Sequence, residues 1–191
     1  RYPRARVLIL RTVLPELKRS LIPRSQEKFD HSVATYRSAD KEWRFNNGSI
    51  IEFGYMNTED DVYQYKSAEY DIVFIDEATE VTEFQFRYLM SRIRITAWRK
   101  NMGAWPHMIL CTNPGGPGHS WVKQRYITPE PAGYKIIPYT DKVMIKDTEV
   151  EVTLERVFIP SRLKDNEKLL VNQPTYVLQL KQTGSAQLVK A

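Results

Sequence analysis

The sequence predicts an α/β fold with a mainly parallel sheet and an antiparallel hairpin, and three observations carry this prediction. Residues 72–75 read Ile-Val-Phe-Ile, an apolar run typical of a parallel strand that is buried on both faces. Similar runs at 7–10 and 108–111 alternate with segments of helical periodicity. Segments 43–45 and 50–53 flank an Asn-Asn-Gly-Ser turn, which is a strong hairpin signal.

Length and composition limit the alternatives. A chain of 191 residues is long enough for one domain with a sizeable core. The net charge of +5 is compatible with a polyanionic partner but does not identify one. The single cysteine, Cys111, excludes an internal disulfide and a cysteine-based metal site, so we expect an intracellular protein. No apolar run is long enough to span a membrane, and no signal peptide is visible.

The elements of the first half follow in order. The strand at 7–10 ends in Arg11 and Thr12. Pro15 suits the first turn of a helix, which we expect to end where Pro23 interrupts it. The acidic stretch 57–61 is typical of a solvated loop.

The second half begins with a clear helix signal. Residues 82–85, Thr-Glu-Phe-Gln, match a capping box, and apolar side chains follow at helical spacing. After the strand at 108–111 comes a turn rich in Pro and Gly, and then a helix at 119–126. Further strands are predicted at 134–137 and 155–159, and a short helix at 174–180.

Two acidic residues follow the apolar strand directly, and they form the candidate site. The carboxyl ends of strands in α/β sheets border the crevice where ligands bind. An aspartate in this position, Asp76, can hold Mg²⁺ through its water shell during nucleotide hydrolysis. Because successive strand residues point to opposite faces, Glu77 need not share the metal and could polarise the attacking water. The alternative is that the two carboxylates only cap the following helix.

A second polar pair follows the strand at 108–111. Thr112 and Asn113 precede Pro114-Gly115-Gly116, so the loop could present a hydroxyl and an amide to a ligand. The alternative is that these residues form an ordinary turn.

Three separated segments together resemble the large terminase subunit, the ATP-driven DNA-packaging motor of tailed bacteriophages. They are residues 72–79 with the helix ending Ser-Arg-Ile-Arg at 91–94, residues 109–114, and residues 158–166. Their order and spacing cover nearly the whole chain. The resemblance implies a three-layer, P-loop NTPase-like fold and a partial terminase ATPase domain over residues 1–191.

The resemblance also implies roles for individual residues. Asp76 matches the Walker B acid that is associated with Mg²⁺, and Glu77 matches the catalytic glutamate. Thr112 and Asn113 match the motif that senses the γ-phosphate of ATP and couples hydrolysis to motion. Lys66 lies where the family often carries a basic residue that acts on a neighbouring subunit's nucleotide.

The basic residue is the least specific of these assignments. A guanidinium is usual for this role because its planar fork matches phosphate, whereas Lys66 offers a point charge. Arg92 and Arg94 are rival candidates, and Lys66 could equally be an ordinary solvated side chain.

Two departures from the family pattern are clear. The sequence contains no GxxxxGK[ST] loop to hold the β- and γ-phosphates, which in the family precedes the strand at 7–10. It also lacks the acid-rich nuclease region that follows the ATPase domain in the family. We therefore expect a segment of a longer motor that binds nucleotide poorly in isolation and is inactive without its missing parts.

The leading functional hypothesis is coupling of Mg-ATP hydrolysis to translocation of double-stranded DNA into a procapsid. The implied partners are the DNA phosphate backbone, a portal protein, the small terminase subunit and further copies in a ring. The implied location is the cytoplasm of a bacterial host, for a phage or prophage protein without membrane attachment. The alternatives are a non-catalytic remnant or assembly module, a helicase-like NTPase and, with least support, a metal-dependent nuclease.

Overall fold

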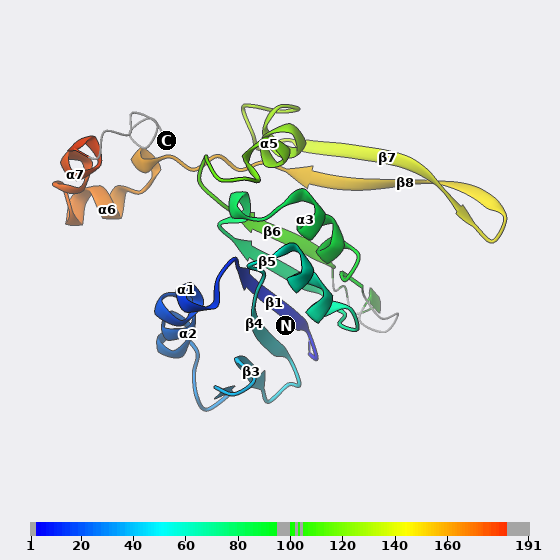
Figure 1. The fold of residues 1–191 in the computed structure, drawn as a ribbon, viewed down its shortest axis with the longest axis horizontal. Coiled ribbons are helices and arrows are strands. Elements are labelled where there is room, and N and C mark those ends of the chain that lie inside the picture. Colours follow the sequence, from blue (N-terminus) through cyan, green and yellow to red (C-terminus); the bar gives the residue numbers. More distant parts are fainter. Residues whose placement is uncertain (1–2, 95–99, 102, 104, 183–191) are drawn as a thin grey trace. The chain divides into compact units, whose positions relative to one another are not determined.

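The computed structural model describes residues 3–94, 100–101, 103 and 105–182 (Figure 1). The chain divides into two compact units, residues 1–122 and residues 123–191. The prediction that residues 1–191 form one partial domain stays a prediction, because compactness alone does not show which unit folds by itself.

The first unit is built on a six-stranded sheet with the strand order β2-β3-β4-β1-β5-β6 (Figure 1). Strands β4, β1, β5 and β6 are parallel, whereas β2, β3 and β4 are antiparallel. The predicted fold class, a mainly parallel sheet with an antiparallel hairpin, is confirmed. The strands are β1 (Arg6–Arg11), β2 (Ala34–Arg37), β3 (Glu42–Phe45), β4 (Ile50–Tyr55), β5 (Ile72–Asp76) and β6 (His107–Cys111).

The predicted hairpin is the pair β3 and β4. Its turn is closed by the Phe45 amide, which donates to the Ser49 carbonyl at 2.9 Å. Gly48 has a φ of +81°, a conformation that costs glycine little. The Asn47 side chain accepts from the Ser49 amide at 3.0 Å, so the Asn-Gly pair makes the turn that the sequence predicts.

Two helices cover one face of this sheet, α1 (Leu14–Arg19) and α2 (Leu21–Lys28). The prediction that Pro23 ends the first helix is wrong. The break lies at Ser20, and Pro23 sits in the first turn of α2, where the amide it lacks would have no helical partner.

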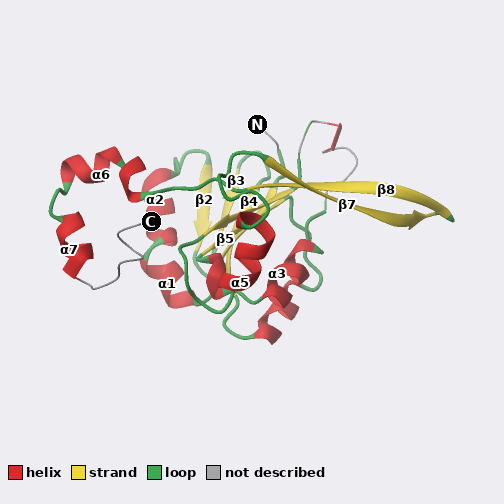
Figure 2. Cartoon of the chain, turned by 90° about the horizontal axis from the view of Figure 1, so that it is seen from above, coloured by secondary structure: helices red, strands yellow, loops and turns green. Residues whose placement is uncertain are grey.

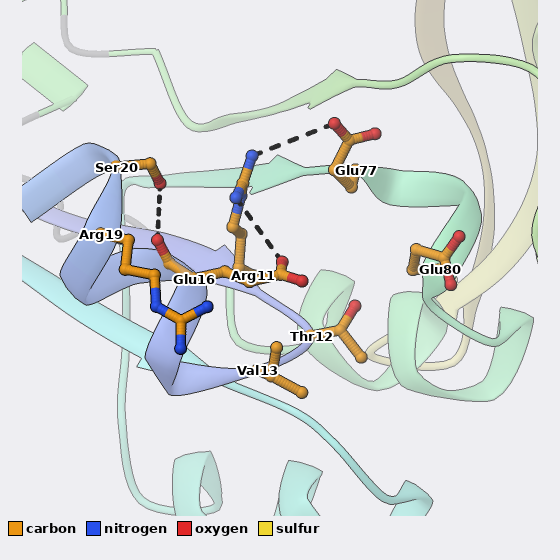
Figure 3. Close-up of a pocket in the computed structure, with 8 residues that line it drawn as sticks. All are labelled: Arg11, Thr12, Val13, Glu16, Arg19, Ser20, Glu77 and Glu80. Carbon is orange, nitrogen blue, oxygen red and sulfur yellow. Dashed lines mark hydrogen bonds and ion pairs between the residues drawn. The ribbon is translucent and has the colours of Figure 1, made fainter. Parts of the chain in front are cut away.

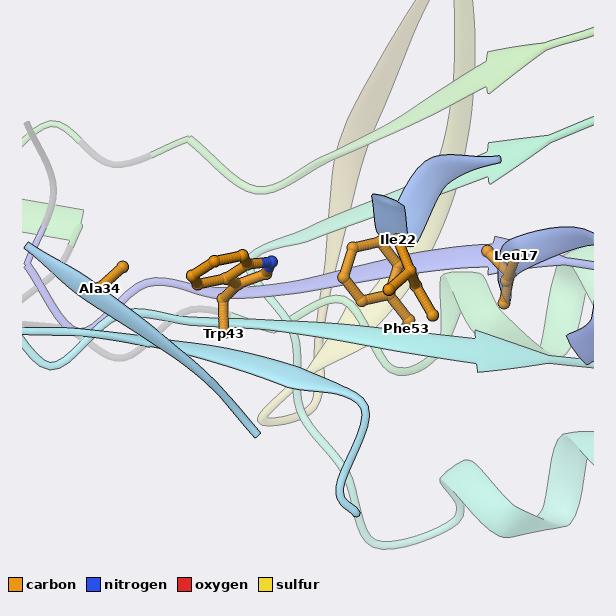
Figure 4. Close-up of a cluster of buried hydrophobic side chains, with 5 residues drawn as sticks. All are labelled: Leu17, Ile22, Ala34, Trp43 and Phe53. Carbon is orange, nitrogen blue, oxygen red and sulfur yellow. The ribbon is translucent and has the colours of Figure 1, made fainter. Parts of the chain in front are cut away.

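The core beneath these helices combines aromatic and aliphatic side chains (Figure 4). Trp43 is fully buried, packs edge-on against Phe29 at 5.3 Å between ring centroids, and donates its indole N–H to Ser25 Oγ at 2.9 Å. This contact ties strand β3 to helix α2. The buried residues of the cluster are Leu17, Ile22, Ala34, Trp43 and Phe53.

The opposite face carries the other side chains of β1. Leu8 and Leu10 are fully buried and alternate with Ile9, which belongs to the first core. Gly54 on β4 lies against Tyr65 and Leu10, and a side chain at Gly54 would collide with the Tyr65 hydroxyl. The 3-10 helix η1 (Glu59–Tyr65) and helix α3 (Glu83–Met90) pack together, so helices flank the sheet on both faces (Figure 2).

Two of the sequence predictions concern η1 and α3. The capping box of α3 is confirmed, since the Gln85 amide donates to Thr82 Oγ1 and the Gln85 side chain accepts from the Thr82 amide. The prediction of a solvated loop at 57–61 is wrong in its second half, because η1 begins at Glu59. The Asp61 carboxylate accepts from the Thr58 amide at 2.8 Å and caps that helix.

The remaining elements of this unit follow the strand ends. They are the short 3-10 helix η2 (Ala78–Glu80) after β5 and helix α5 (His119–Val122) after the loop that follows β6. No helix in the described ranges combines the length and the apolar composition that a membrane crossing requires.

The second unit contains a long two-stranded ribbon, β7 (Ile136–Ile145) and β8 (Thr148–Val157). The predicted strands at 134–137 and 155–159 are its base only. Lys146 and Asp147 form the turn with φ values of +47° and +61°, so the turn lacks the glycine that usually announces it. Its other elements are η3 (Lys123–Ile127), η4 (Leu163–Asp165), α6 (Glu167–Asn172) and α7 (Tyr176–Gln182).

Candidate functional site

The parallel strands bring three chain segments to one edge of the sheet. In the strand register Leu10 lies beside Ile75 and Asp76 lies beside Cys111, so the carboxyl ends of β1, β5 and β6 are neighbours. The predicted acid pair, Asp76 and Glu77, lies at this edge. The sequence therefore places its carboxylates where α/β sheets bind ligands.

An arginine at the end of β1 binds these acids. The Arg11 Nε donates to Asp76 Oδ2 at 2.8 Å. Another guanidinium nitrogen lies 3.9 Å from Glu77 Oε1 (Figure 3). A third carboxylate, that of Glu16 on α1, lies 3.5 Å from the same guanidinium. The Arg11 side chain is only 19% exposed. A single cation thus holds three carboxylates together.

The backbone at Glu77 has an unusual conformation. Its φ and ψ are +55° and +51°, a left-handed conformation that costs a residue with a side chain free energy. The strand alternation ends there, so the expectation that Asp76 and Glu77 point to opposite faces is wrong. Both carboxylates lie within 4 Å of the Arg11 guanidinium.

The surroundings shift the protonation of Glu77. Burial raises the pKa of its carboxyl group, the negative charge of Asp76 raises it further, and the Arg11 charge opposes both. Partial burial, with Asp76 and Glu77, also raises the pKa of the neighbouring Cys111 thiol. A carboxylate with a raised pKa is a better proton acceptor than an ordinary surface glutamate.

An open cavity of about 600 Å³ adjoins Arg11 and Glu77 (Figure 3). Its wall combines both charges with hydroxyl groups, so it suits a polar, charged ligand. The lining residues are Arg11, Thr12, Val13, Glu16, Arg19, Ser20, Glu77 and Glu80.

The loop after β6 is bonded to the segment after β5. The Thr112 hydroxyl lies 2.7 Å from the Thr79 hydroxyl and accepts from the Thr79 amide at 3.1 Å. The Thr79 hydroxyl also donates to the Asn113 carbonyl at 3.1 Å. Thr79 is 4% exposed, whereas the side chains of Thr112 and Asn113 lie at the surface. The Thr112–Asn113 pair is therefore held against the segment that directly follows the acid pair.

Glycines allow this close approach. The Gly118 amide donates to the Thr79 carbonyl at 2.6 Å, and an added methyl group at Gly116 would lie 2.6 Å from the same oxygen. The Trp121 indole donates to the Val81 carbonyl at 2.8 Å. The backbone contacts fix the loop against η2, so the Pro/Gly-rich segment is more than a solvated turn.

The three candidates for the basic residue are not next to the acid pair. Lys66 is exposed at the end of η1, and its carbonyl accepts from the Arg92 guanidinium at 2.6 Å. The Arg92 carbonyl accepts in turn from the Tyr70 amide at 2.9 Å, close to the amino end of β5. Arg94 pairs with Glu69 at 3.3 Å. The structure thus does not bring these cations to the acid pair of the same chain.

Two important residues were missed from the sequence, Arg11 and Thr79. Arg11 directly follows an apolar run, as Asp76 does, and this shared position is the sequence signal that identifies it as a site residue. Thr79 offered no comparable signal, because its role depends on the contact between two loops.

The side chains at the ends of the strands determine whether this site suits a magnesium ion. Among the residues that the structure describes, no group of three or more His, Cys, Asp or Glu side chains is arranged to hold a metal ion. Magnesium in nucleotide sites needs only one or two carboxylates, with water and phosphate oxygens completing its shell. A carboxylate has about four lone-pair positions, so the Asp76 bond to Arg11 leaves acceptor capacity. The Asp76 carboxylate is therefore chemically suited to a magnesium ion that is bound through water.

Comparisons with known proteins point to one family. A family model described as phage terminase large subunit matches residues 1–177. No curated protein matches the chain. Two structures of the large terminase from a thermophilic bacteriophage are similar to it, one of them in complex with ADP.

The similarity to those structures is partial. Each is 16% identical to this sequence, and the TM-scores are 0.49 and 0.46. Each alignment covers 69% of this chain and 31% of the other, so the chain spans about a third of the length of those terminases.

Proposed function

The chain belongs to the phage terminase large subunit family, and we propose that it carries the hydrolytic acids of a DNA-packaging ATPase. The observation that supports this best is the convergence of Asp76, Glu77 and the Thr112 loop at neighbouring strand ends, where Glu77 lines an open, charged cavity. ATP is the proposed substrate, and double-stranded DNA is the polymer moved.

Each residue has a proposed role. Asp76 would hold a water ligand of Mg²⁺, which would neutralise phosphate charge when bound. Glu77 accepts a proton from the attacking water, and its raised pKa suits this task. Arg11 is a positioning residue, since its guanidinium fixes Asp76 and lies close to Glu77.

The bond between Thr79 and Thr112 suggests a route for coupling. A change at the end of β5 is carried through the Thr79 hydroxyl to the Thr112 loop, because both segments share hydrogen bonds. Asn113, exposed at the same edge, is proposed to contact the γ-phosphate or a water bound to it.

Nucleotide binding also requires a phosphate cradle. Within the described part of the chain, β6 is the last strand of the sheet, and Ile109 on it is 41% exposed. An open edge of this kind favours pairing with a further strand. We propose that the longer protein supplies a further strand, which pairs with β6 and brings the glycine-rich loop to the site.

The proposed partners are further copies in a ring, a portal protein and the small terminase subunit, in the cytoplasm of a bacterial host. DNA contact would be to phosphates, because a packaging motor must move any sequence. Lys66, which is exposed at the end of η1, is proposed to act on a neighbour's nucleotide, with Arg92 and Arg94 as rivals.

A second function is favoured by one observation. The Arg11 guanidinium already lies within 4 Å of both acids, as expected of an assembly module that keeps the fold without turnover. The two functions predict different results for the full protein: a packaging ATPase hydrolyses ATP, and an assembly module does not.

The test is substitution of Glu77 by Gln in the full protein that contains these residues. ATP affinity should remain within about threefold, while steady-state hydrolysis should fall by roughly 10² or more, because the proton acceptor is lost. Glu83→Gln is the matched control, since Glu83 is exposed and pairs only with Arg87 in the bonds described. Unchanged turnover in Glu77→Gln would remove Glu77 from its proposed role.

Coupling needs a separate experiment. Thr112→Ala and Asn113→Ala should reduce the rate of DNA packaging more than they reduce ATP affinity. If both variants package DNA at the parental rate, the loop is only a structural turn.

A further inference from the structure

The guanidinium of Arg92 is bound by groups that carry no charge. It donates to the Lys66 carbonyl at 2.6 Å and to the Ser91 hydroxyl at 3.0 Å. Its central carbon lies 5.3 Å from the centre of the Tyr88 ring, which is a cation–π contact. The Arg92 side chain would have to give up these contacts before it could bind a phosphate group itself.

The Lys66 side chain is in a different situation. It is exposed, and within the described ranges its ammonium group has neither a hydrogen bond nor an ion pair. The backbone of Lys66, by contrast, is bound at both groups. The carbonyl accepts from Arg92, and the amide donates to the Tyr63 carbonyl at 3.1 Å. The main chain of Lys66 is therefore fixed while its charge stays available to a ligand.

The backbone of Arg92 is anchored beside the central strand. The Arg92 carbonyl accepts from the Tyr70 amide at 2.9 Å, and the Arg94 amide donates to the Tyr70 carbonyl at 3.0 Å. Tyr70 is 2% exposed and lies two residues before β5. Arg92 thus links the Lys66 segment to the buried residues that lead into the strand ending in Asp76.

Helix α3 and the residues after it contact η1 along its whole length. At the start of η1, the buried Gln85 side chain donates to the Thr58 carbonyl at 2.8 Å. Farther along, the rings of Tyr63 and Tyr88 pack edge to face with 5.6 Å between their centroids. The Arg92 bond holds the other end. Its loss should release the end of η1 that carries the cation, while the start stays bound.

The two cations suit different tasks. A guanidinium is planar and has five donors, so it can lie over an aromatic ring and bind a carbonyl at the same time. A lysine ammonium is a compact charge on a flexible stem, so its effect on a phosphate group depends on where its backbone is fixed.

We propose that Arg92 is a positioning residue, whose guanidinium holds the Lys66 segment so that the Lys66 ammonium reaches a phosphate group of the nucleotide on which it acts. Lys66 is then the acting cation, and Arg92 works only through it. This inference rests on the proposed role of Lys66 in ATP hydrolysis and adds a separate task for Arg92.

The test is a double-mutant cycle on steady-state ATP hydrolysis by the full protein. Lys66→Ala should lower kcat at least about tenfold, because the charge that stabilises the transferred phosphoryl group is lost. Arg92→Met keeps a long side chain but has no donor, and it should lower kcat about fivefold with KM within about twofold of the parent. The double variant should hydrolyse ATP like Lys66→Ala alone, because Arg92 acts through Lys66.

The matched control is Arg87→Met. Arg87 lies on α3, is exposed and pairs with Glu83, so this variant should hydrolyse ATP like the parent. Hydrogen exchange without nucleotide gives a readout that does not depend on turnover. Residues 59–70 should exchange faster in Arg92→Met than in the parent and in Arg87→Met, because the end of η1 is released.

Three results would overturn the proposal. If the losses of the two single variants multiply in the double variant, Arg92 acts on the nucleotide by itself. A parental kcat in Lys66→Ala would leave Arg92 no cation to position. Unchanged exchange in Arg92→Met would show that the bond does not hold the segment.

Folding and the proposed function are checked separately. Circular dichroism shows whether Arg92→Met keeps its fold, and Tyr88→Leu, which removes only the ring beneath the guanidinium, should show the same pattern with smaller losses. A parent that does not hydrolyse ATP would overturn the proposed function and the role of Arg92 together. If the parent hydrolyses ATP, Glu77→Gln does not, and the losses at Lys66 and Arg92 multiply, only the role of Arg92 is wrong.

Discussion

The strand-end site of the first unit and the β7–β8 ribbon of the second are held by different means. At the strand ends, Arg11 binds Asp76 and lies close to Glu77, and Thr79 binds Thr112. In the ribbon, most contacts run between its own two strands, and apolar side chains are exposed on both sides, among them Tyr139 and Met144. Side-chain bonds within the first unit thus fix the positions of the predicted acids and of the Thr112 loop, whereas much of the ribbon's apolar surface is exposed in the part of the chain that the structure describes.

The largest stability effect should follow overpacking of the strand-end loop. In Gly118→Ala, the added methyl group would collide with the Val81 and Thr79 carbonyl oxygens, which are backbone atoms and cannot turn aside. The free energy of unfolding should fall by about 2 kcal/mol. Urea unfolding measures it, with the exposed Ser120→Ala as control. A loss below about 0.5 kcal/mol would show that the loop is looser than this comparison requires.

A smaller effect should come from the bond between the two loops. Thr79→Val and Thr112→Val each remove a hydroxyl from the same pair, so each should cost about 1 kcal/mol of unfolding free energy. The double variant should cost clearly less than the sum, because the second change finds the bond already lost. Additive losses would mean that the hydroxyls act independently.

The charge of Arg11 should control the pH dependence of hydrolysis. Its positive charge lowers the pKa of Glu77, so Arg11→Gln should raise that pKa and move the acid limb of the kcat/KM profile to higher pH. The sign follows because Glu77 must be deprotonated to accept a proton. Arg11→Lys keeps the charge and should move the limb less. A limb unchanged in Arg11→Gln would mean that another group sets it.

The smallest effect is expected in the ribbon. Glu151→Gln changes an exposed side chain of β8, so the free energy of unfolding should change by less than about 0.5 kcal/mol. Thermal unfolding of the full protein measures this. A loss near that of Gly118→Ala would show that the ribbon is as constrained as the strand ends.

Sequence patterns predicted the elements that rest on local signals. The apolar runs indicated β1, β5 and β6, the Asn47-Gly48 turn indicated the first hairpin, and the capping box indicated α3. Each of these signals lies within a few neighbouring residues, so no tertiary contact is needed to read it.

The misses have physical causes. Pro23 does not end a helix because the break at Ser20 starts a new helix, in whose first turn a proline is tolerated. The length of the ribbon was missed because its turn, at Lys146 and Asp147, takes a left-handed conformation without glycine. Arg11 and Thr79 gain their roles only when strands distant in sequence lie side by side.

A single-turnover experiment tests the central claim, that Asp76 and Glu77 form a hydrolytic centre, most directly. The full protein is mixed with a substoichiometric amount of radiolabelled ATP and Mg²⁺, quenched, and the fraction of bound ATP converted to ADP is measured. The parent should convert the bound ATP, whereas Glu77→Gln should hold it uncleaved at similar affinity. Cleavage in Glu77→Gln at the parental rate would contradict the account.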